Sequence, residues 1–268
     1  MAKARCKTRR HLSFEVFPFS YQEYLAFVRQ APGADTFRAY LDDGGFPMFL
    51  RERRDLVLRE LLRDVVQRDV AARHGLRETR HVMNLLLFLL ANTGQPFSFQ
   101  TLTKNLAVPT VGQTSRYLEF IEDAYLLFPV PKFSASFKQR VIAPVKYYAM
   151  DNGLRRANCP QSQPDLGHRL ENAVGLHLRR ADRQLWYAGE RDRWECDFFT
   201  AEAAIQVCLE LTPENRRREL GGVIEATRLR GQRRALVLTL DQTDALREDG
   251  VAIEVLPAWR WMSGDTTF

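Results

Sequence analysis

The pattern of hydrophobic and polar positions divides the chain into a helical first half and a second half in which strands and helices alternate. Apolar residues recur at helical spacing over 51–74, and the segment 78–93 is apolar on nearly every side from Val82 onward. A helix that is apolar all round is a buried one. We therefore expect a long amphipathic helix over 51–74 and a buried helix over 78–93.

A helix–turn–helix pattern follows the buried helix. A short helix is expected over 98–107, a tight turn at 108–109 and a further helix over 110–127. Two extended segments, at 126–133 and 145–150, come next. A buried helix, a short helix, a turn, a helix and a β-ribbon in this order are typical of a winged helix-turn-helix. The pattern predicts a winged helix in this part of the chain.

From about residue 151 the chain alternates between the helical period and the strand period. Interleaved strands and helices indicate an α/β layer fold. The predicted fold class is therefore α/β with an all-α, winged-helix N-terminal half, and the strands at 184–188 and 251–256 are expected at exposed sheet edges. The elements expected in this part are helices over 166–181 and 214–230 and strands over 184–188, 193–200, 204–211, 234–240 and 251–256.

Composition and charge change this picture only a little. Lys and Arg total 39 against 33 Asp and Glu, which gives a formal net charge of +6. This surplus favours anionic partners slightly, and an ordinary solvated surface explains it equally well. The apolar run 85–91 is far too short to span a bilayer, and no stretch of signal-peptide length follows the basic N-terminus. We expect a cytoplasmic chain with no membrane partner, in which the four scattered cysteines are reduced.

Polar residues near the predicted helix–turn–helix are candidates for DNA contact. Gln113, Thr114 and Arg116 fall outside the apolar stripe of the second helix, and Gln or Arg can make bidentate contacts to base edges in the major groove. Lys104 and Lys132 are candidates for phosphate contacts nearby. Acidic residues on the same helix would repel phosphate. Specific DNA reading, weak non-specific contact and a packing or dimerisation role are therefore all open.

Acidic residues in the second half follow the layout of a restriction-endonuclease-like site. Such nucleases hold a divalent cation with carboxylates and polarise the attacking water with a lysine. The sequence order is an acidic residue on a helix, an Asp on one strand and E-x-K on the next. Glu171 shares the packing face of its predicted helix, where a carboxylate is costly without a partner. The period of two places Glu195 and Asp197 on one face of their strand.

The next strand carries Gln206 and Cys208 at the positions of E-x-K. Gln206 offers a neutral oxygen, and Cys208 carries no positive charge. The two carboxylates Glu171 and Asp197 could still hold Mg²⁺ weakly, with waters completing its octahedron. The sequence thus predicts a degenerate site. Residual cleavage, a softer metal at Cys208, and a face that simply packs or binds a partner are the alternatives.

Several segments together resemble the C-terminal portion of a large group of prokaryotic AAA+-type ATPases. In order they are YLDDGGFPMFL, LLLFLLANTGQPFSFQTLTKNLAV, YLEFIEDAYLLF, KYYAMDNGLR, HRLENAVGLHLRR and ECDFF, and the resemblance runs from about Leu12 to Trp261. In that family a P-loop ATPase domain precedes a winged helix and a restriction-endonuclease-like domain of unknown function. The resemblance implies the end of an ATPase domain with linker helices at 1–45, a helical and winged-helix domain at 46–150, and a nuclease-like domain at 151–268.

The nucleotide-binding motif of that family does not occur in this chain. A P-loop needs the string G-x-x-x-x-G-K-[ST], so we expect no ATP binding by this chain alone and no cofactor other than Mg²⁺ at the degenerate site. The resulting hypothesis is a non-catalytic, DNA-associated or regulatory module of such an ATPase. The alternatives are a weak metal-dependent DNA endonuclease and an interaction subunit that joins a separate ATPase chain or a second copy of itself.

Overall fold

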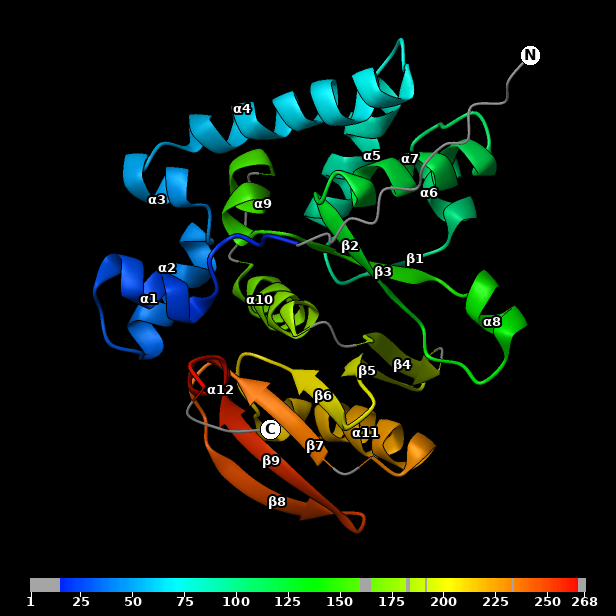
Figure 1. Cartoon of the computed structure of the whole chain (residues 1–268). Helices are drawn as coiled ribbons and strands as arrows, with labels where there is room; N and C mark the ends of the chain where they lie inside the picture. Colours follow the sequence, from blue (N-terminus) through cyan, green and yellow to red (C-terminus); the bar gives the residue numbers. More distant parts are fainter. Residues whose placement is uncertain (1–14, 160–164, 182–183, 191, 233, 265–268) are drawn as a thin grey trace, which may run out of the picture.

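The computed structural model describes residues 15–159, 165–181, 184–190, 192–232 and 234–264, and Figure 1 shows their arrangement. The chain is a mixed α/β structure. Its first half is largely helical, and its last part forms a mixed six-stranded sheet with flanking helices. None of the described helices is long and apolar enough to cross a membrane.

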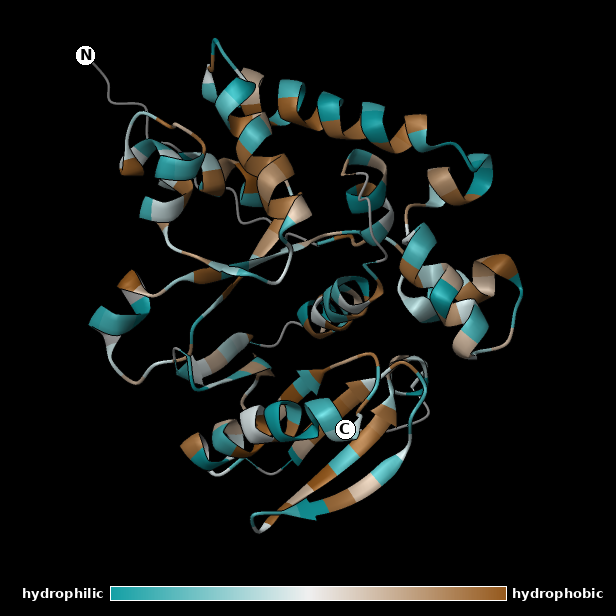
Figure 2. Cartoon of the chain, turned by 180° about the vertical axis from the view of Figure 1, so that it is seen from behind, coloured by the Kyte–Doolittle hydropathy of each residue, from teal (hydrophilic) through white to brown (hydrophobic). Residues whose placement is uncertain are grey.

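Local signals in the sequence set the ends of the first helices. Ser20 caps α1 by accepting a hydrogen bond from the backbone N–H of Glu23, and the Glu23 carboxylate accepts one from the N–H of Ser20. Arg53 takes a left-handed conformation and ends α3, so the helix expected from residue 51 starts only at Asp55. The helices of this part are α1 (Tyr21–Val28), α2 (Ala34–Asp43), α3 (Pro47–Glu52), α4 (Asp55–Val65), the π-helix η1 (Val66–Ala72), α5 (Arg80–Ala91), α6 (Phe99–Asn105) and α7 (Val111–Asp123). Figure 2 shows the alternating hydrophilic and hydrophobic bands along the long helix formed by α4 and η1.

A three-stranded antiparallel sheet has β3 as its central strand. Strands β2 and β3 correspond to the extended segments expected at 126–133 and 145–150. Because β1 and β2 both pair with β3, backbone hydrogen bonds hold β3 on its two edges. The strands are β1 (Pro96–Phe97), β2 (Leu127–Pro131) and β3 (Val145–Ala149), and the short helices α8 (Phe137–Ile142) and α9 (Asn152–Asn158) flank β3 in the chain.

The six-stranded sheet has the order β4-β5-β6-β7-β9-β8. The strand expected over 251–256 is β9, and its expected place at a sheet edge is wrong because β8 pairs along its outer side. Strand β8 was not expected from the sequence, because its residues DALRE are mostly polar, as is common for exposed edge strands. The elements of this part are β4 (Trp186–Glu190), β5 (Trp194–Phe199), β6 (Ala203–Val207), β7 (Arg234–Thr239), β8 (Asp244–Glu248), β9 (Val251–Pro257), α10 (Leu166–Arg180), α11 (Pro213–Arg230) and α12 (Ala258–Met262).

Helix α10 lies between the two sheets, where it packs against β3 and β6, and α11 covers the other face of the large sheet (Figure 1). This layering follows from the two-residue period of the strands, because successive side chains point to opposite faces of the sheet. Ile205 and Leu236 belong to the core that α10 shares, whereas Ala204 and Val237 belong to the core beneath α11. The large sheet is therefore buried on both faces, and α10 joins it to the helical half.

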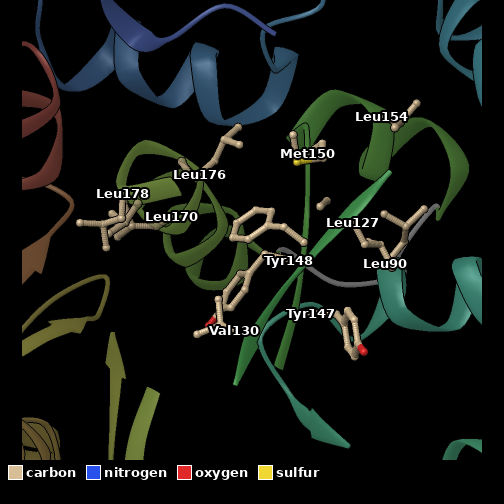
Figure 3. Close-up of a cluster of buried hydrophobic side chains, with 14 of the residues drawn as sticks. Leu90, Leu127, Val130, Tyr147, Tyr148, Met150, Leu154, Leu170, Leu176 and Leu178 are labelled. Carbon is tan, nitrogen blue, oxygen red and sulfur yellow. The ribbon is translucent and has the colours of Figure 1, made fainter. Parts of the chain in front are cut away.

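The larger core is continuous from α1 to α12. It includes Tyr148 of β3, Leu127 of β2, Leu90 of α5 and Leu170 of α10, which Figure 3 labels. Fully buried aliphatic side chains of this kind each contribute roughly 1.5–3 kcal/mol of burial free energy. The core therefore continues across residue 150, where a domain boundary is expected from the sequence, and it packs β3 against α10.

Candidate functional site

A buried lysine meets three carboxylates where the two sheets and α10 come together. The Nζ atom of Lys146 lies 2.7 Å from Oε1 of Glu195, 3.2 Å from Oδ1 of Asp197 and 3.6 Å from Oε1 of Glu171. The Lys146 side chain is only 2% exposed. These four residues, named here the carboxylate–lysine cluster, are the candidate site.

The alternation of β3 explains how the lysine reaches this position. Lys146 and Tyr148 share one face of the strand, and both contact Glu171 of α10. The hydroxyl of Tyr148 donates to Oε1 of Glu171 at 2.7 Å. Tyr147 points the other way and hydrogen-bonds Glu122 of α7. One strand thus supplies a charged and a polar partner to the same carboxylate.

The backbone at Gly94 leaves room for Glu171. Gly94 has φ +82, and a Cβ atom there would lie 2.8 Å from Oε1 of Glu171. The turn after α5 therefore needs a glycine for two reasons, since left-handed backbone disfavours other residues and a side chain would push the carboxylate away. This close approach helps to keep the Glu171 side chain in place, with 14% of it exposed.

Burial and charge set the ionisation of the cluster. Burial raises the pKa of Glu171 to about 8, and the charge of Asp197 acts in the same direction. Burial alone would lower the pKa of Lys146, but the three surrounding carboxylates together raise it above its usual value. The carboxylates thus stabilise the charge on Lys146, whereas burial makes Glu171 easier to protonate than an exposed glutamate.

Asp197 is held from both sides. Its Oδ1 accepts from Lys146, and its Oδ2 accepts a hydrogen bond from the backbone N–H of Val207 in β6 at 3.0 Å. Glu195 lies two residues earlier on the same face, as the sequence predicted, and Cys196 points into the core beneath α11. Glu195 is the more open of the two carboxylates, at 45% exposure against 10% for Asp197.

Gln206 and Cys208 do not take part in the cluster in the way that E-x-K residues would. The Nε2 atom of Gln206 donates to Oε2 of the buried Glu219 at 2.8 Å, and its Oε1 has no hydrogen-bond partner among the described residues. Burial raises the pKa of Cys208 to about 12, with Glu219 adding to the shift, so this thiol stays protonated at neutral pH. A protonated thiol is a poor ligand for a soft metal.

Lys146 is the residue that the sequence reasoning missed. The E-x-K pattern places its lysine on the strand after Asp197, and that strand is β6. The lysine instead comes from β3, 51 residues before Asp197, in the three-stranded sheet. One signal was present in the sequence. Lys146 is the charged residue within the otherwise apolar run VKYYAM, and such a residue inside a strand suggests a buried partner.

The cluster borders a cavity of about 1020 Å³ that has an acidic lining. Glu171, Glu195, Asp197 and Glu219 line it together with Glu190 and Asp192, whereas its basic lining residues are Lys132, Arg193 and Arg218. Arg218 and Arg193 are themselves paired, with Glu219 and Glu190. Lys146 in turn pairs with Glu195 and Asp197, so the lining as a whole keeps only a modest surplus of negative charge.

The candidate DNA-binding residues separate into three groups. Lys104, Gln113 and Arg116 are exposed on α6 and α7. Thr114 is fully buried, and its hydroxyl hydrogen-bonds the Thr103 hydroxyl at 2.8 Å, so its expected contact with DNA is wrong. Its side chain joins α6 to α7 because it lies on the packing side of the helix. Lys132 is half-buried after β2 and lines the acidic cavity.

Metal-ligand geometry is not found in the part of the chain that the structure describes. There, no group of three or more His, Cys, Asp or Glu side chains is arranged to hold a metal ion. The carboxylates that the sequence assigned to Mg²⁺, Glu171 and Asp197, instead have the ammonium of Lys146 between them.

Comparison with known proteins finds a matching family model and longer relatives of this chain. Residues 34–165 match a domain of unknown function (DUF8612). The chain is 28% identical over 225 residues to an uncharacterized protein of Haemophilus influenzae, covering 77% of this chain and 55% of that protein. It is also 28% identical over 290 aligned positions to the uncharacterized protein MJ1544 of Methanocaldococcus jannaschii, covering 94% of this chain and 63% of that protein. No solved structure matches it. The chain is thus similar to a domain of unknown function and spans little more than half of two longer proteins.

Proposed function

We propose that this chain is a non-catalytic, nucleic-acid-associated or regulatory module that resembles the C-terminal half of a prokaryotic AAA+-type ATPase. The order α5, α6, α7, β2 and β3 supports a winged helix, because it gives three helices followed by an antiparallel ribbon. The mixed sheet between α10 and α11, with Glu171 on a helix and Asp197 on a strand, supports a restriction-endonuclease-like domain.

One observation carries the non-catalytic assignment. The ammonium of Lys146 lies within 3.6 Å of an oxygen of each of the three carboxylates. A divalent cation in a nuclease needs those oxygens as ligands. Here those oxygens are engaged by the ammonium of a side chain of the same protein. The proposed role of the cluster is to hold β3, α10 and β5 together.

The proposed nucleic-acid contact uses the exposed side of α6 and α7. Lys104 and Arg116 are exposed there, with Gln113 beside them. The acidic cavity is the less suitable surface, because its lining carboxylates repel phosphate.

Incubation of the protein with supercoiled plasmid and Mg²⁺ or Mn²⁺ tests the proposal. We expect no nicking above background, and a mobility shift that weakens steeply with salt. The matched variant is Asp197→Asn, which keeps the shape of the side chain and removes its charge. Metal-dependent nicking by the natural chain that disappears in Asp197→Asn would overturn the non-catalytic assignment.

A weak metal-dependent endonuclease is the second candidate. The observation that favours it is Lys146 itself, which places an ammonium beside Glu171 and Asp197 at the edge of a cavity of about 1020 Å³. In that case Lys146 would stand in for the lysine that β6 lacks. The two candidates differ in the plasmid assay, since Lys146→Met would then abolish nicking and Lys132→Met would leave it.

A further inference from the structure

We infer that the ammonium of Lys146 takes the place of the divalent cation in the carboxylate–lysine cluster, so that the natural chain binds no divalent metal there and the cluster instead locks the two sheets together. This inference deepens the proposed non-catalytic function and depends on it. It assigns to Lys146 the role of an internal cation that the chain carries on β3.

The first support is the geometry of the ammonium. A lysine ammonium has three donors, and the cluster presents one carboxylate oxygen from each of three residues. The distances are 2.7 Å to Glu195 and 3.2 Å to Asp197, with Glu171 slightly farther at 3.6 Å. The acidic residues come from α10 and β5, and the cation comes from β3. The charged side chains of the cluster thus come from both sheets and from α10.

The second support is electrostatic. Two positive charges a few ångströms apart repel each other much more strongly at a buried site than in water. A divalent ion beside Asp197 and Glu171 would lie at a comparable distance from the Lys146 ammonium and would carry twice the charge. The ammonium therefore weakens metal binding at the cluster while it stays in place.

The third support is that Lys146 has little freedom to leave. Its strand is paired on both edges, and its side chain is 2% exposed. The ring of Tyr187 lies 5.4 Å from Nζ and adds a cation–π interaction. If the ammonium moved out of the cluster, it would lose its contacts with the three carboxylates and with the ring of Tyr187.

The fourth support comes from the other side chains in the predicted nuclease positions. Gln206 directs its amide N–H to Glu219, and its free Oε1 lies close to Gly222 of α11. Cys208 offers a sulfur atom, which suits soft metals better than the hard Mg²⁺. Neither residue therefore adds a charged ligand, so a Mg²⁺ ion would depend on the carboxylates that Lys146 already engages.

Manganese binding by the natural chain and by Lys146→Met tests the inference. Mn²⁺ alone is the probe, followed by electron paramagnetic resonance and by thermal unfolding with and without Mn²⁺. We expect no binding at the cluster in the natural chain. Because Lys146→Met leaves the carboxylates without a cation, we expect a lower melting temperature that Mn²⁺ restores, and an affinity for Mn²⁺ at least about tenfold higher than in the natural chain.

Two controls define the site. Lys132→Met removes a positive charge from the lining of the same cavity and should not create Mn²⁺ binding. The double variant Lys146→Met with Asp197→Asn should lose the Mn²⁺ binding that Lys146→Met gains. If Lys146→Met does not fold in buffer, its refolding yield from urea with Mn²⁺ against EDTA takes the place of the melting temperature.

Two results would overturn the inference. The first is stoichiometric Mn²⁺ binding by the natural chain that is lost in Asp197→Asn. The second is a Lys146→Met protein whose melting temperature or refolding yield does not respond to Mn²⁺. These results are distinct from a failure of the proposed function, because Mn²⁺ binding without plasmid nicking rejects the internal cation alone, whereas nicking rejects the non-catalytic role.

Discussion

The Nζ atom of Lys146 lies 2.7 Å from Oε1 of Glu195, and this ion pair joins the central strand of the three-stranded sheet to the second strand of the six-stranded sheet. The same ammonium also contacts Asp197 and Glu171, so a single side chain connects β3 to both β5 and α10. A substitution that breaks this cluster should therefore lower the stability of the whole fold as well as that of β3.

Loss of Asp197 should destabilise the protein far more than loss of Glu195. Asp197→Ala removes a buried partner of Lys146 and leaves the N–H of Val207 without its acceptor. Breaking a buried ion pair in this way costs about 3–5 kcal/mol. Glu195 is 45% exposed, and Glu195→Ala should cost about 1 kcal/mol or less. Urea unfolding of both variants measures the difference, and equal destabilisation by the two substitutions would contradict this view of the cluster.

Neighbouring glycines in α11 should respond in opposite ways to alanine. A Cβ at Gly222 would collide with the carbonyl oxygen of Glu195, whereas a Cβ at Gly221 meets nothing within 4 Å. Gly222→Ala should destabilise by about 1–3 kcal/mol or more, because α11 must move away from β5. Gly221→Ala should be neutral or stabilise by up to about 1 kcal/mol through helix propensity. Thermal unfolding of the two variants makes the comparison, and similar melting temperatures would argue against close packing of α11 on β5.

Glu122 should make stability depend on pH. Burial raises the pKa of Glu122 from 4.5 to about 7, against a hydrogen bond from Tyr147 that lowers it. A carboxyl whose pKa is raised in the folded state contributes stability below its unfolded pKa and loses it as the pH rises through the folded value. The contribution is therefore complete below about pH 4.5 and lost between about pH 4.5 and 7.

Glu122→Gln removes this titration and keeps a hydrogen-bond acceptor for Tyr147. It should stabilise the protein at pH 8 by about 1–2 kcal/mol, allowing for the partial exposure of the side chain, and change little at pH 4.5. Urea unfolding at the two pH values measures the effect. Glu60→Gln, on the exposed side of α4, is the control. A gain of equal size at both pH values would disprove the assignment.

The two kinds of residue on α7 should separate DNA binding from stability. Arg116→Ala combined with Lys104→Ala should weaken the mobility shift and lower its salt slope by about two, because two phosphates are no longer neutralised. Thr114→Val should instead lower stability by about 1 kcal/mol, because the half-buried Thr103 hydroxyl loses one of its two hydrogen-bond partners and keeps only the carbonyl oxygen of Phe99. It should leave DNA binding of the folded protein unchanged. An unchanged shift in the double variant would exclude this face as the DNA-binding surface.

Much of the secondary structure followed from local patterns. The capping box at Ser20 and the apolar run that forms α5 are visible in the sequence, and so is the alternation that turns Glu195 and Asp197 away from Cys196. These features depend on the chemistry of a few adjacent residues. The misplaced edge at β9 has the opposite cause, since a strand cannot show in its own sequence whether a polar neighbour such as β8 will pair with it.

For the candidate site, the sequence by itself predicted that Glu171 lies on the packing face of its helix and that Glu195 and Asp197 share one face of their strand. Only the tertiary structure decided which cation those carboxylates meet. Lys146 reaches them because α10 packs between β3 and β6 and brings two separate sheets together. The physical reason is that local periodicity fixes the face on which a side chain lies, whereas the identity of its partner depends on contacts between segments that are far apart along the chain.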